Sequence, residues 1–265
     1  MKTTFALAGI ALALCSMAPA QDSTQRVVVP AQNSTRPRKV TVHSNNGSIT
    51  VKASNGKEVI VETSGGRDGR PATTPDGLRR IDGPRGGVNI EAQDNQIVVN
   101  PGISHGDLTI SVPPDTSLNL HTLHGAITVE GVHGEIEVET LNGRANLTNV
   151  SGNVLANSNN GQITVSMDRV DTSKPLSFAT LNGTIDVTMP ADWKANVKLN
   201  TWHGAVYSDF DFKLGGGGVI TQGNNTGDGR YKVKVDNTIV GSINGGGPEA
   251  TFKTLNGNIY IRKKK

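Results

Sequence analysis

A glycine recurs at every ninth position through the middle of the chain. Between Thr122 and Val165 this spacing repeats without interruption, at Gly125, Gly134, Gly143, Gly152 and Gly161. Two residues after each glycine begins an alternation of aliphatic and polar or small residues, which is typical of a strand with one buried face. The residues before the strand are often Asn or His followed by Gly, and these tolerate positive φ. Each nine-residue unit therefore predicts a turn followed by a short strand.

The true period is a pair of these units. A four-residue motif, TLHG, TLNG, SNNG, TLNG and TWHG in successive copies, begins at Thr122, Thr140, Ser158, Thr180 and Thr201, and the differences between these successive numbers are 18, 18, 22 and 21. A repeat of constant register favours a coil that advances sideways, with each strand stacked on its equivalent. We therefore expect an all-β chain that forms one parallel β-helix, or β-solenoid. Each coil is about 18–22 residues long, at the short end of solenoid repeats, and has two short strands.

The aliphatic positions predict four inward rows. They are Ile127, Ala145, Ile163, Ile185 and Val206; Val129, Leu147, Val165 and Val187; Ile136, Val154, Leu176 and Val197; and Val138, Ala156, Phe178 and Leu199. A left-handed hexapeptide helix needs an aliphatic residue every six positions, but the sixth position beyond Ile127 is His133. Crossovers between parallel strands favour the right hand, so we predict a right-handed coil. An antiparallel hairpin at each Asn-Gly pair is the alternative.

The corner glycines are the structural site residues that the repeat predicts. We expect positive φ at these corners, including Gly143 and Gly161, so that a Cβ atom would be destabilising there. The set comprises Gly47, Gly56, Gly106, Gly125, Gly134, Gly143, Gly152, Gly161, Gly183, Gly204 and Gly257.

Residues 1–20 have the features of a secretory signal peptide. Lys2 precedes the apolar run "FALAGIALAL", and Ala18-Pro19-Ala20 forms a small-residue cleavage site before Gln21. Acylation of Cys15 is the alternative, although Leu14 stands where a lipoprotein signal has a small residue. Cleavage after Ala20 would leave no cysteine and no transmembrane helix in the mature chain. The signal predicts export to the periplasm, the cell envelope or the extracellular medium.

The rest of the chain divides into a tether and the repeat domain. Residues 21–38 are polar and predict a flexible tether, and residues 39–265 predict the solenoid. The segment Ser44–Thr63 has the repeat pattern at the N-terminal end of the array. Excursions rich in Gly or Pro are expected near 64–87 and 208–230. The first of these carries five arginines and is interpreted as a solvated loop or as a basic loop that grips an acidic partner.

The sequence contains few signals for chemistry. The net charge of +3 gives no indication of nucleic-acid binding. Gly-x-Ser-x-Gly, His-Glu-x-x-His and Walker motifs are missing from the sequence. A glycosidase needs a carboxylate pair, and nothing in the spacing pairs the available acids, which are Asp192, Asp186, Glu135 and Asp115. We expect no catalytic residue and no cofactor.

Several polar sets could form binding sites. Four histidines, His105, His124, His133 and His203, occupy the turn position before glycine, which explains them without a ligand. His121 and His124 could together bind a transition metal, but we expect no metal site. The row Thr128, Asn146, Thr164 and Asp186 is flat and polar, yet Ala126, Arg144, Gln162 and Thr184 interrupt the second row that ice binding would need. Glu135, Glu137 and Glu139 form an acidic edge, interpreted as solvated.

The repeats resemble a bacterial family of putative adhesins that has a domain of unknown function. The family is similar to the GIN head domain of autotransporter adhesins. The similarity rests on the "TLNG-x-I-x-V" repeats, on "LTISVPPDTSLNLHTLHG" and on the closing "GSINGGGPEATFKTLNGNIYI". It implies an exported β-helix without known catalysis. We expect a surface ligand, which is a glycan or a protein. The alternative is a polysaccharide-active lyase or glycosidase on a β-helix.

Overall fold

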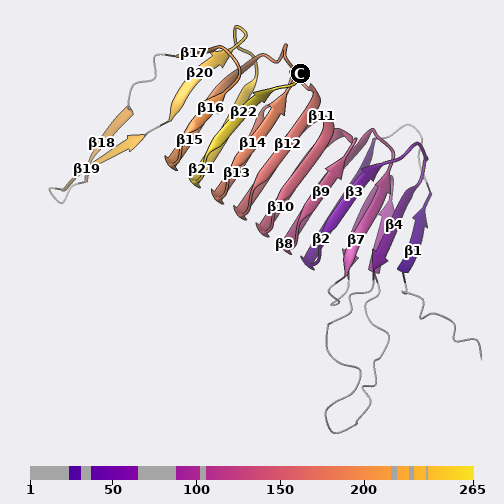
Figure 1. The fold of residues 1–265 in the computed structure, drawn as a ribbon. Coiled ribbons are helices and arrows are strands. Elements are labelled where there is room, and N and C mark those ends of the chain that lie inside the picture. The colour runs from indigo at the N-terminus through magenta and orange to yellow at the C-terminus, as the bar shows by residue number, and fades with distance from the viewer. Residues whose placement is uncertain are drawn as a thin grey trace, which may run out of the picture.

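The computed structural model describes residues 24–30, 37–64, 88–101, 106–215, 220–226, 230–236 and 238–265. These residues form strands, turns and bends (Figure 1), which confirms the all-β prediction. In chain order the strands are β1 (Thr24–Val29), β2 (Arg38–Asn46), β3 (Ile49–Ala53), β4 (Val59–Ser64), β5 (Val88–Gln93), β6 (Gln96–Pro101), β7 (Asp107–Val112), β8 (Thr116–His124), β9 (Ile127–Glu130), β10 (His133–Asn142) and β11 (Ala145–Asn160). They continue with β12 (Ile163–Val170), β13 (Leu176–Asn182), β14 (Ile185–Met189), β15 (Ala195–His203), β16 (Val206–Ser208), β17 (Phe212–Leu214), β18 (Ile220–Thr226), β19 (Arg230–Asp236), β20 (Ile239–Ile243), β21 (Glu249–Asn256) and β22 (Ile259–Lys263).

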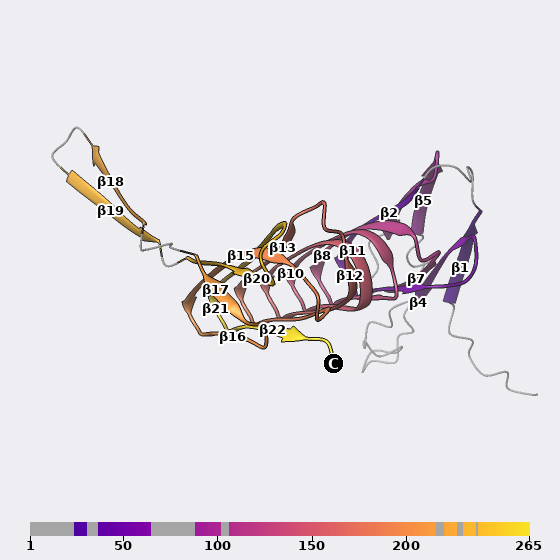
Figure 2. The same cartoon turned by 90° about the horizontal axis from the view of Figure 1, so that it is seen from above.

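Twenty of the strands belong to one sheet of mixed orientation, and β18 and β19 pair separately. Seen from above, the large sheet folds over into two facing layers (Figure 2). We call them the long-strand layer, formed by β2, β8, β10, the second part of β11, β13, β21 and β15, and the short-strand layer, formed by β7, β3, β9, the first part of β11, β12, β14, β22 and β16. The apolar core lies between the layers and contains fully buried residues from both, such as Phe178 and Ile163.

Parallel pairing joins equivalent positions of successive repeats in the middle of the sheet. Ile136 of β10 is paired with Leu118 of the repeat before it and with Val154 of the repeat after it. Ile163 is paired with Ile185, the next member of its predicted inward row. The prediction of two short strands per repeat is wrong for the long-strand layer. In that layer the strand of one nine-residue unit continues into the Thr-Leu that begins the next corner motif, so that β10 has ten residues.

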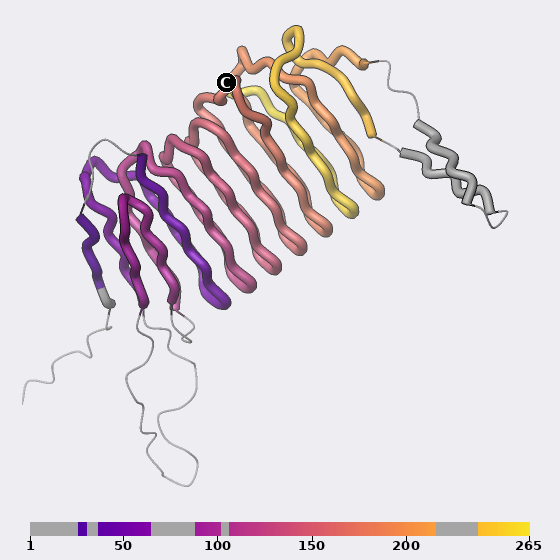
Figure 3. Tube along the Cα trace, turned by 180° about the vertical axis from the view of Figure 1, so that it is seen from behind, coloured from indigo at the N-terminus to yellow at the C-terminus, as the bar shows by residue number. Residues whose placement is uncertain are grey.

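The C-terminal repeat lies inside the stack rather than at its end. β21 pairs with β13 on one side and with β15 on the other, and β22 lies between β14 and β16 in the same way. Figure 3 shows this yellow segment between two orange ones. Val206 was predicted to follow Ile185 in its row, but Ile259 separates them. The other three predicted rows also receive a residue from the C-terminal repeat. Ala250 separates Leu176 from Val197, and Phe252 separates Phe178 from Leu199. Ile261 extends the remaining row beyond Val187.

The N-terminal repeat is intercalated as well. β2 lies between β6 and β8, and β3 lies between β7 and β9, although residues 88–112 follow them in the chain. The repeat at Ser44–Thr63 is therefore not the N-terminal end of the array. Its second half is also not a parallel rung, because β4 pairs antiparallel with β7.

Antiparallel strands flank the parallel stack at both ends. β1 is added antiparallel to β4, and β20 pairs antiparallel with β15 and β17. Such pairing protects an edge that would otherwise present unpaired backbone groups. A parallel β-helix over all of residues 39–265 is therefore wrong at these ends. Thr24–Val29 belong to the sheet rather than to a free tether, and the predicted excursion 208–230 contains β17 and β18. The excursion near 64–87 lies, from residue 65 on, outside the described residues.

Each residue of the repeated corner motif has its own structural role. In most repeats the Thr or Ser hydroxyl donates a hydrogen bond to a glycine carbonyl of the adjacent corner, as Thr180 does to Gly161 at 3.0 Å, whereas the buried hydroxyl of Thr122 has no hydrogen-bond partner. The Asn side chains of adjacent repeats are hydrogen-bonded to one another, as in Asn182 to Asn160 at 2.9 Å. The Leu points outward and stays partly exposed.

The glycine of the motif is required by close approach. A Cβ atom on Gly161 would overlap the carbonyl group of Gly143 in the adjacent coil. Gly143 meets the carbonyl of Gly125 in the same way. Positive φ, which was predicted for Gly143 and Gly161, is not found there, although Gly47 has a φ of 110° and Gly152 a φ of 106°. At Gly56 a Cβ atom would have room, since the nearest atom is 3.7 Å away.

Candidate functional site

The outward face of the long-strand layer carries many of the candidate binding groups among the described residues, and we call this face the wall. Alternation along each strand sends every second residue outward, as in Glu135, Glu137 and Glu139 of β10. Parallel registration then aligns these positions across strands. His43, His121 and Glu139 stand side by side in this way. The wall is thus a set of rows that run across the strands, and residues of one row on neighbouring strands lie about 4.8 Å apart.

The acidic edge on β10 is matched by partners on neighbouring elements. Glu135 forms an ion pair with Lys174, Glu137 accepts a hydrogen bond from Asn119 at 2.8 Å, and Glu139 lies 3.2 Å from Nδ1 of His121. The Glu135 carboxylate holds the pKa of Lys174 above its usual value. Lys198 of β15 lowers the pKa of Glu249 on β21 through a hydrogen bond. The charges of the wall therefore link neighbouring strands.

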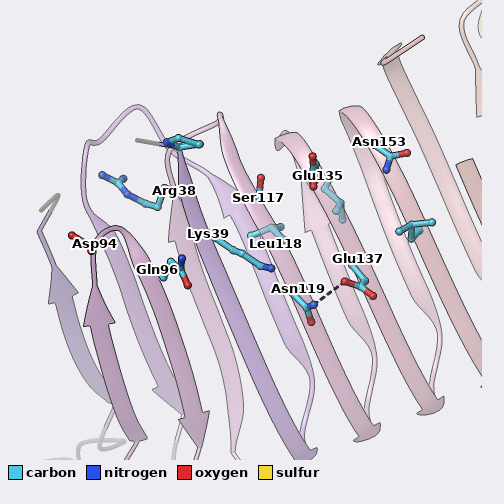
Figure 4. Close-up of a pocket in the computed structure, with 13 residues that line it drawn as sticks. Arg38, Lys39, Asp94, Gln96, Ser117, Leu118, Asn119, Glu135, Glu137 and Asn153 are labelled. Atoms are coloured by element: carbon cyan, nitrogen blue, oxygen red, sulfur yellow. Dashed lines mark hydrogen bonds between the residues drawn. The ribbon is translucent and has the colours of Figure 1, made fainter. Parts of the chain in front are cut away.

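A groove of about 410 Å³ crosses the end of the wall near β2 (Figure 4). Arg38, Lys39 and Gln96 lie on one side of it, and Glu135 and Glu137 lie on the other. Arg38 donates a hydrogen bond to the carbonyl of Lys57 at 2.8 Å. The groove thus places basic and acidic groups opposite each other on an open surface.

The histidine hypotheses can be compared with the structure. His124 continues the Asn row, since its Nδ1 lies 3.3 Å from Nδ2 of Asn142, and His203 is aligned with Asn256. His121 contacts Glu139 and His43, with ring centroids 6.1 Å apart in the latter pair, rather than His124. His105 lies outside the described residues. Across the described ranges, no group of three His, Cys, Asp or Glu residues is arranged to hold a metal ion.

The four carboxylates considered for catalysis are not brought together in pairs. Glu135 is engaged by Lys174 on the wall, whereas Asp186 accepts two hydrogen bonds from Arg262 on the short-strand layer. The Asp186 carboxylate raises the pKa of Arg262. Asp115 follows β7 and Asp192 follows β14, each in a turn. Two of the four carboxylates, Glu135 and Asp186, are therefore paired with cations on different faces of the sheet.

The flat polar row of the short-strand layer has the predicted register. Thr128, Asn146, Thr164 and Asp186 are paired in sequence across β9, β11, β12 and β14. Beyond Asp186 the row continues with Tyr260 and Tyr207, whose rings stack at 5.0 Å with an interplanar angle of 10°. The row therefore ends in aromatic side chains.

A row of exposed apolar side chains runs along the corner edge of the wall, and sequence reasoning missed it. It consists of outward residues that precede the Asn/His row, which are Leu123, Leu141, Leu181, Leu255 and Trp202, with the exposed Asn159 of β11 between Leu141 and Leu181. Trp202 is 61% exposed. The sequence signal is the second position of the Thr-Leu-x-Gly motif. Side chains alternate along a strand, so the residue after the inward Thr points outward. We call this set the Leu/Trp row.

A second groove, of about 550 Å³, adjoins the Leu/Trp row. Its apolar lining comes from Ala179, Leu181, Leu255 and Trp202. Its polar lining comes from the outward residues Glu139, Asn157, Asn159 and Lys253 and from the buried corner residues Ser158, Thr180 and Thr254. A groove with an apolar side and several amide and charged groups can bind an amphipathic ligand.

Among the residues that the structure describes, no helix is long and apolar enough to cross a membrane. The Toastrack DUF4097 family model matches residues 18–240. A putative cell adhesion protein from Clostridium sporogenes ATCC 15579 aligns with 92% of this chain and 100% of its own, at 10% identity and a TM-score of 0.47. A putative adhesin from Bacteroides fragilis NCTC 9343 aligns with 92% of this chain and 98% of its own, at 10% identity and a TM-score of 0.41. No curated protein matches the sequence.

Proposed function

Because the chain belongs to the Toastrack DUF4097 family, we propose that it is an exported, non-catalytic surface or envelope protein. In this proposal the stacked repeats form a β-solenoid scaffold whose wall binds a glycan or a protein. The observation that carries the proposal is the registration of outward residues across the long-strand layer, which aligns polar and apolar rows on one open face. Such a face offers many equivalent contacts to an extended ligand.

The partners of the acidic residues support binding rather than catalysis. A glycosidase needs one carboxylic acid that donates a proton and one carboxylate that acts as base or nucleophile. Here Glu135 is neutralised by Lys174, and the Glu137 carboxylate accepts a hydrogen bond from an amide. Both side chains are already used to join adjacent elements. The competing hypothesis is a polysaccharide-active lyase or glycosidase that works in the groove between Lys39 and Glu135.

One experiment separates the two hypotheses. The purified chain is applied to an array of bacterial and host glycans and extracellular proteins, and the soluble polysaccharides are assayed in parallel for newly formed reducing ends. Binding without release of reducing ends is the expected result. Release of reducing ends that is lost in Glu135→Gln, while Asp192→Asn releases them normally, would overturn the non-catalytic proposal.

Export is the second part of the proposal, and it rests on the signal-like residues 1–20, which lie outside the described residues. Cleavage after Ala20 should give a mature chain that begins with Gln21. N-terminal sequencing of protein from periplasmic and medium fractions tests this prediction. An acylated Cys15 would contradict cleavage at Ala20, and an uncleaved cytoplasmic chain would contradict export.

A further inference from the structure

The exposed aromatic residues of the described chain gather at one corner. Aromatic residues make up only 4% of the sequence, and Phe178, Phe252 and Trp193 are buried in the core. In contrast, Trp202 is 61% exposed and Tyr207 is 52% exposed. These two residues flank the turn between β15 and β16. A chain that uses few aromatic side chains has therefore placed two of its large ones where they cover no core.

Trp202 stands on the groove side of this corner. It lies beside Leu255, because the flanking pairs Thr201–Thr254 and His203–Asn256 fix the register of β15 and β21. The same argument places Leu255 beside Leu181 of β13. The indole and the two leucines therefore form one continuous apolar strip along the groove of about 550 Å³.

The rest of the lining, in which Asn159 lies beside Leu181, is polar and carries one charge of each sign. It offers the amides of Asn157 and Asn159, one carboxylate from Glu139 and one ammonium from Lys253. A polyanion would meet as much acidic as basic charge here, so the groove does not select for charge. Amides and balanced charges instead suit a ligand rich in hydroxyl or amide groups.

An uncharged pyranose chain matches this combination. The C–H face of a pyranose ring is apolar and can pack on an indole, while its hydroxyl groups point to the sides and can exchange hydrogen bonds with amides and carboxylates. An N-acetyl group adds an amide for asparagine and a methyl group for leucine. We propose that the groove between Trp202 and Glu139 binds an uncharged or N-acetylated glycan, with Trp202 as the stacking platform. This inference rests on the binding function proposed above and assigns a site to it.

The experiment titrates the full mature chain with chitohexaose, the β-1,4-linked hexamer of N-acetylglucosamine, by calorimetry and by tryptophan fluorescence. Trp193 is 4% exposed, so a ligand-dependent change in emission reports chiefly on Trp202. We expect Trp202→Ala to weaken binding at least tenfold and Trp202→Phe to keep most of it. Leu123→Ala is the matched control, because Leu123 belongs to the same Leu/Trp row but does not line this groove, and it should bind within about twofold of wild type.

Three outcomes would overturn the proposal. They are failure of the wild-type chain to bind chitohexaose, equal binding by wild type and Trp202→Ala, and sedimentation showing that the row around Trp202 joins two copies of the chain instead. Each can be told apart from failure of the proposed function. If the chain still binds other glycans or proteins on the array regardless of Trp202, then the binding function stands and the assignment of the groove is wrong.

Discussion

At the residue scale, the nine-residue spacing of glycine is a consequence of how closely the corners of adjacent repeats approach. The carbonyl of one corner glycine occupies the space in which a Cβ atom of the next would lie, so that the column Gly125, Gly143, Gly161 and Gly183 has no room for a side chain. The hydroxyl of the preceding Thr or Ser donates to the same carbonyl groups, as in Ser158 to Gly143 at 3.1 Å. Packing and hydrogen bonding therefore both fix the position of the corner.

Gly161→Ala should lower the free energy of unfolding by about 1–3 kcal/mol, because backbone must move to admit the methyl group. Gly56→Ala is the control, since its Cβ atom would have only ordinary contacts, with the nearest atom 3.7 Å away. It should change stability by no more than about 0.5 kcal/mol. Urea unfolding of both variants measures the difference. Equal destabilisation would show that close approach does not explain the glycine column.

The direction of side chains along β12 gives a second test at this scale. Ile163 is fully buried between Ala145 and Ile185, whereas its neighbour Gln162 is exposed. Ile163→Asp would bury a charge without a partner and should prevent folding. Gln162→Asp should be tolerated to within about 0.5 kcal/mol. Circular dichroism and urea unfolding report both results, and similar behaviour of the two variants would refute the assigned register.

At the element scale, the sequence predicted which residues form rungs but not the order of the rungs. The spacing of the corner motif correctly identified the neighbours from Ile136 to Leu176, because there the chain advances one rung at a time. Periodicity could not place β21, since its buried Phe252 fits against Phe178 as well as against Leu199 and in fact contacts both strands. The same ambiguity hid the position of β2.

The loss of stability on replacing Phe252 tests this intercalation. Its ring stacks on that of Phe178, with centroids 5.2 Å apart, and it is fully buried. Phe252→Ala should destabilise the chain by about 3–5 kcal/mol, as expected for an interior aromatic residue. Thr251→Ala, next to it on the outward side of β21, should change stability little. Thermal unfolding measures the stability of the two variants. A small loss of stability in Phe252→Ala would contradict an interior position for β21.

At the scale of the whole molecule, intercalation of both terminal repeats determines what the surface presents. The family resemblance inferred from the repeats is confirmed by the match over residues 18–240. The sequence also located the acidic edge of β10, because alternation alone gives its outward direction. It could not locate the groove beside Trp202, because Leu255 and Leu181 become neighbours only through the long-range placement of β21 between β13 and β15.

The order of these three strands can be measured directly with engineered disulfides. In a chain carrying Cys15→Ser, Leu181→Cys combined with Leu255→Cys should crosslink, because adjacent strands lie about 4.8 Å apart and a disulfide spans Cα atoms about 4.4–6.8 Å apart. Leu181→Cys combined with Trp202→Cys should not crosslink, since one strand separates the two residues. Mass spectrometry of non-reduced peptides identifies the linkages. A Leu181–Trp202 crosslink without a Leu181–Leu255 crosslink would place the repeats in chain order and contradict the intercalated architecture.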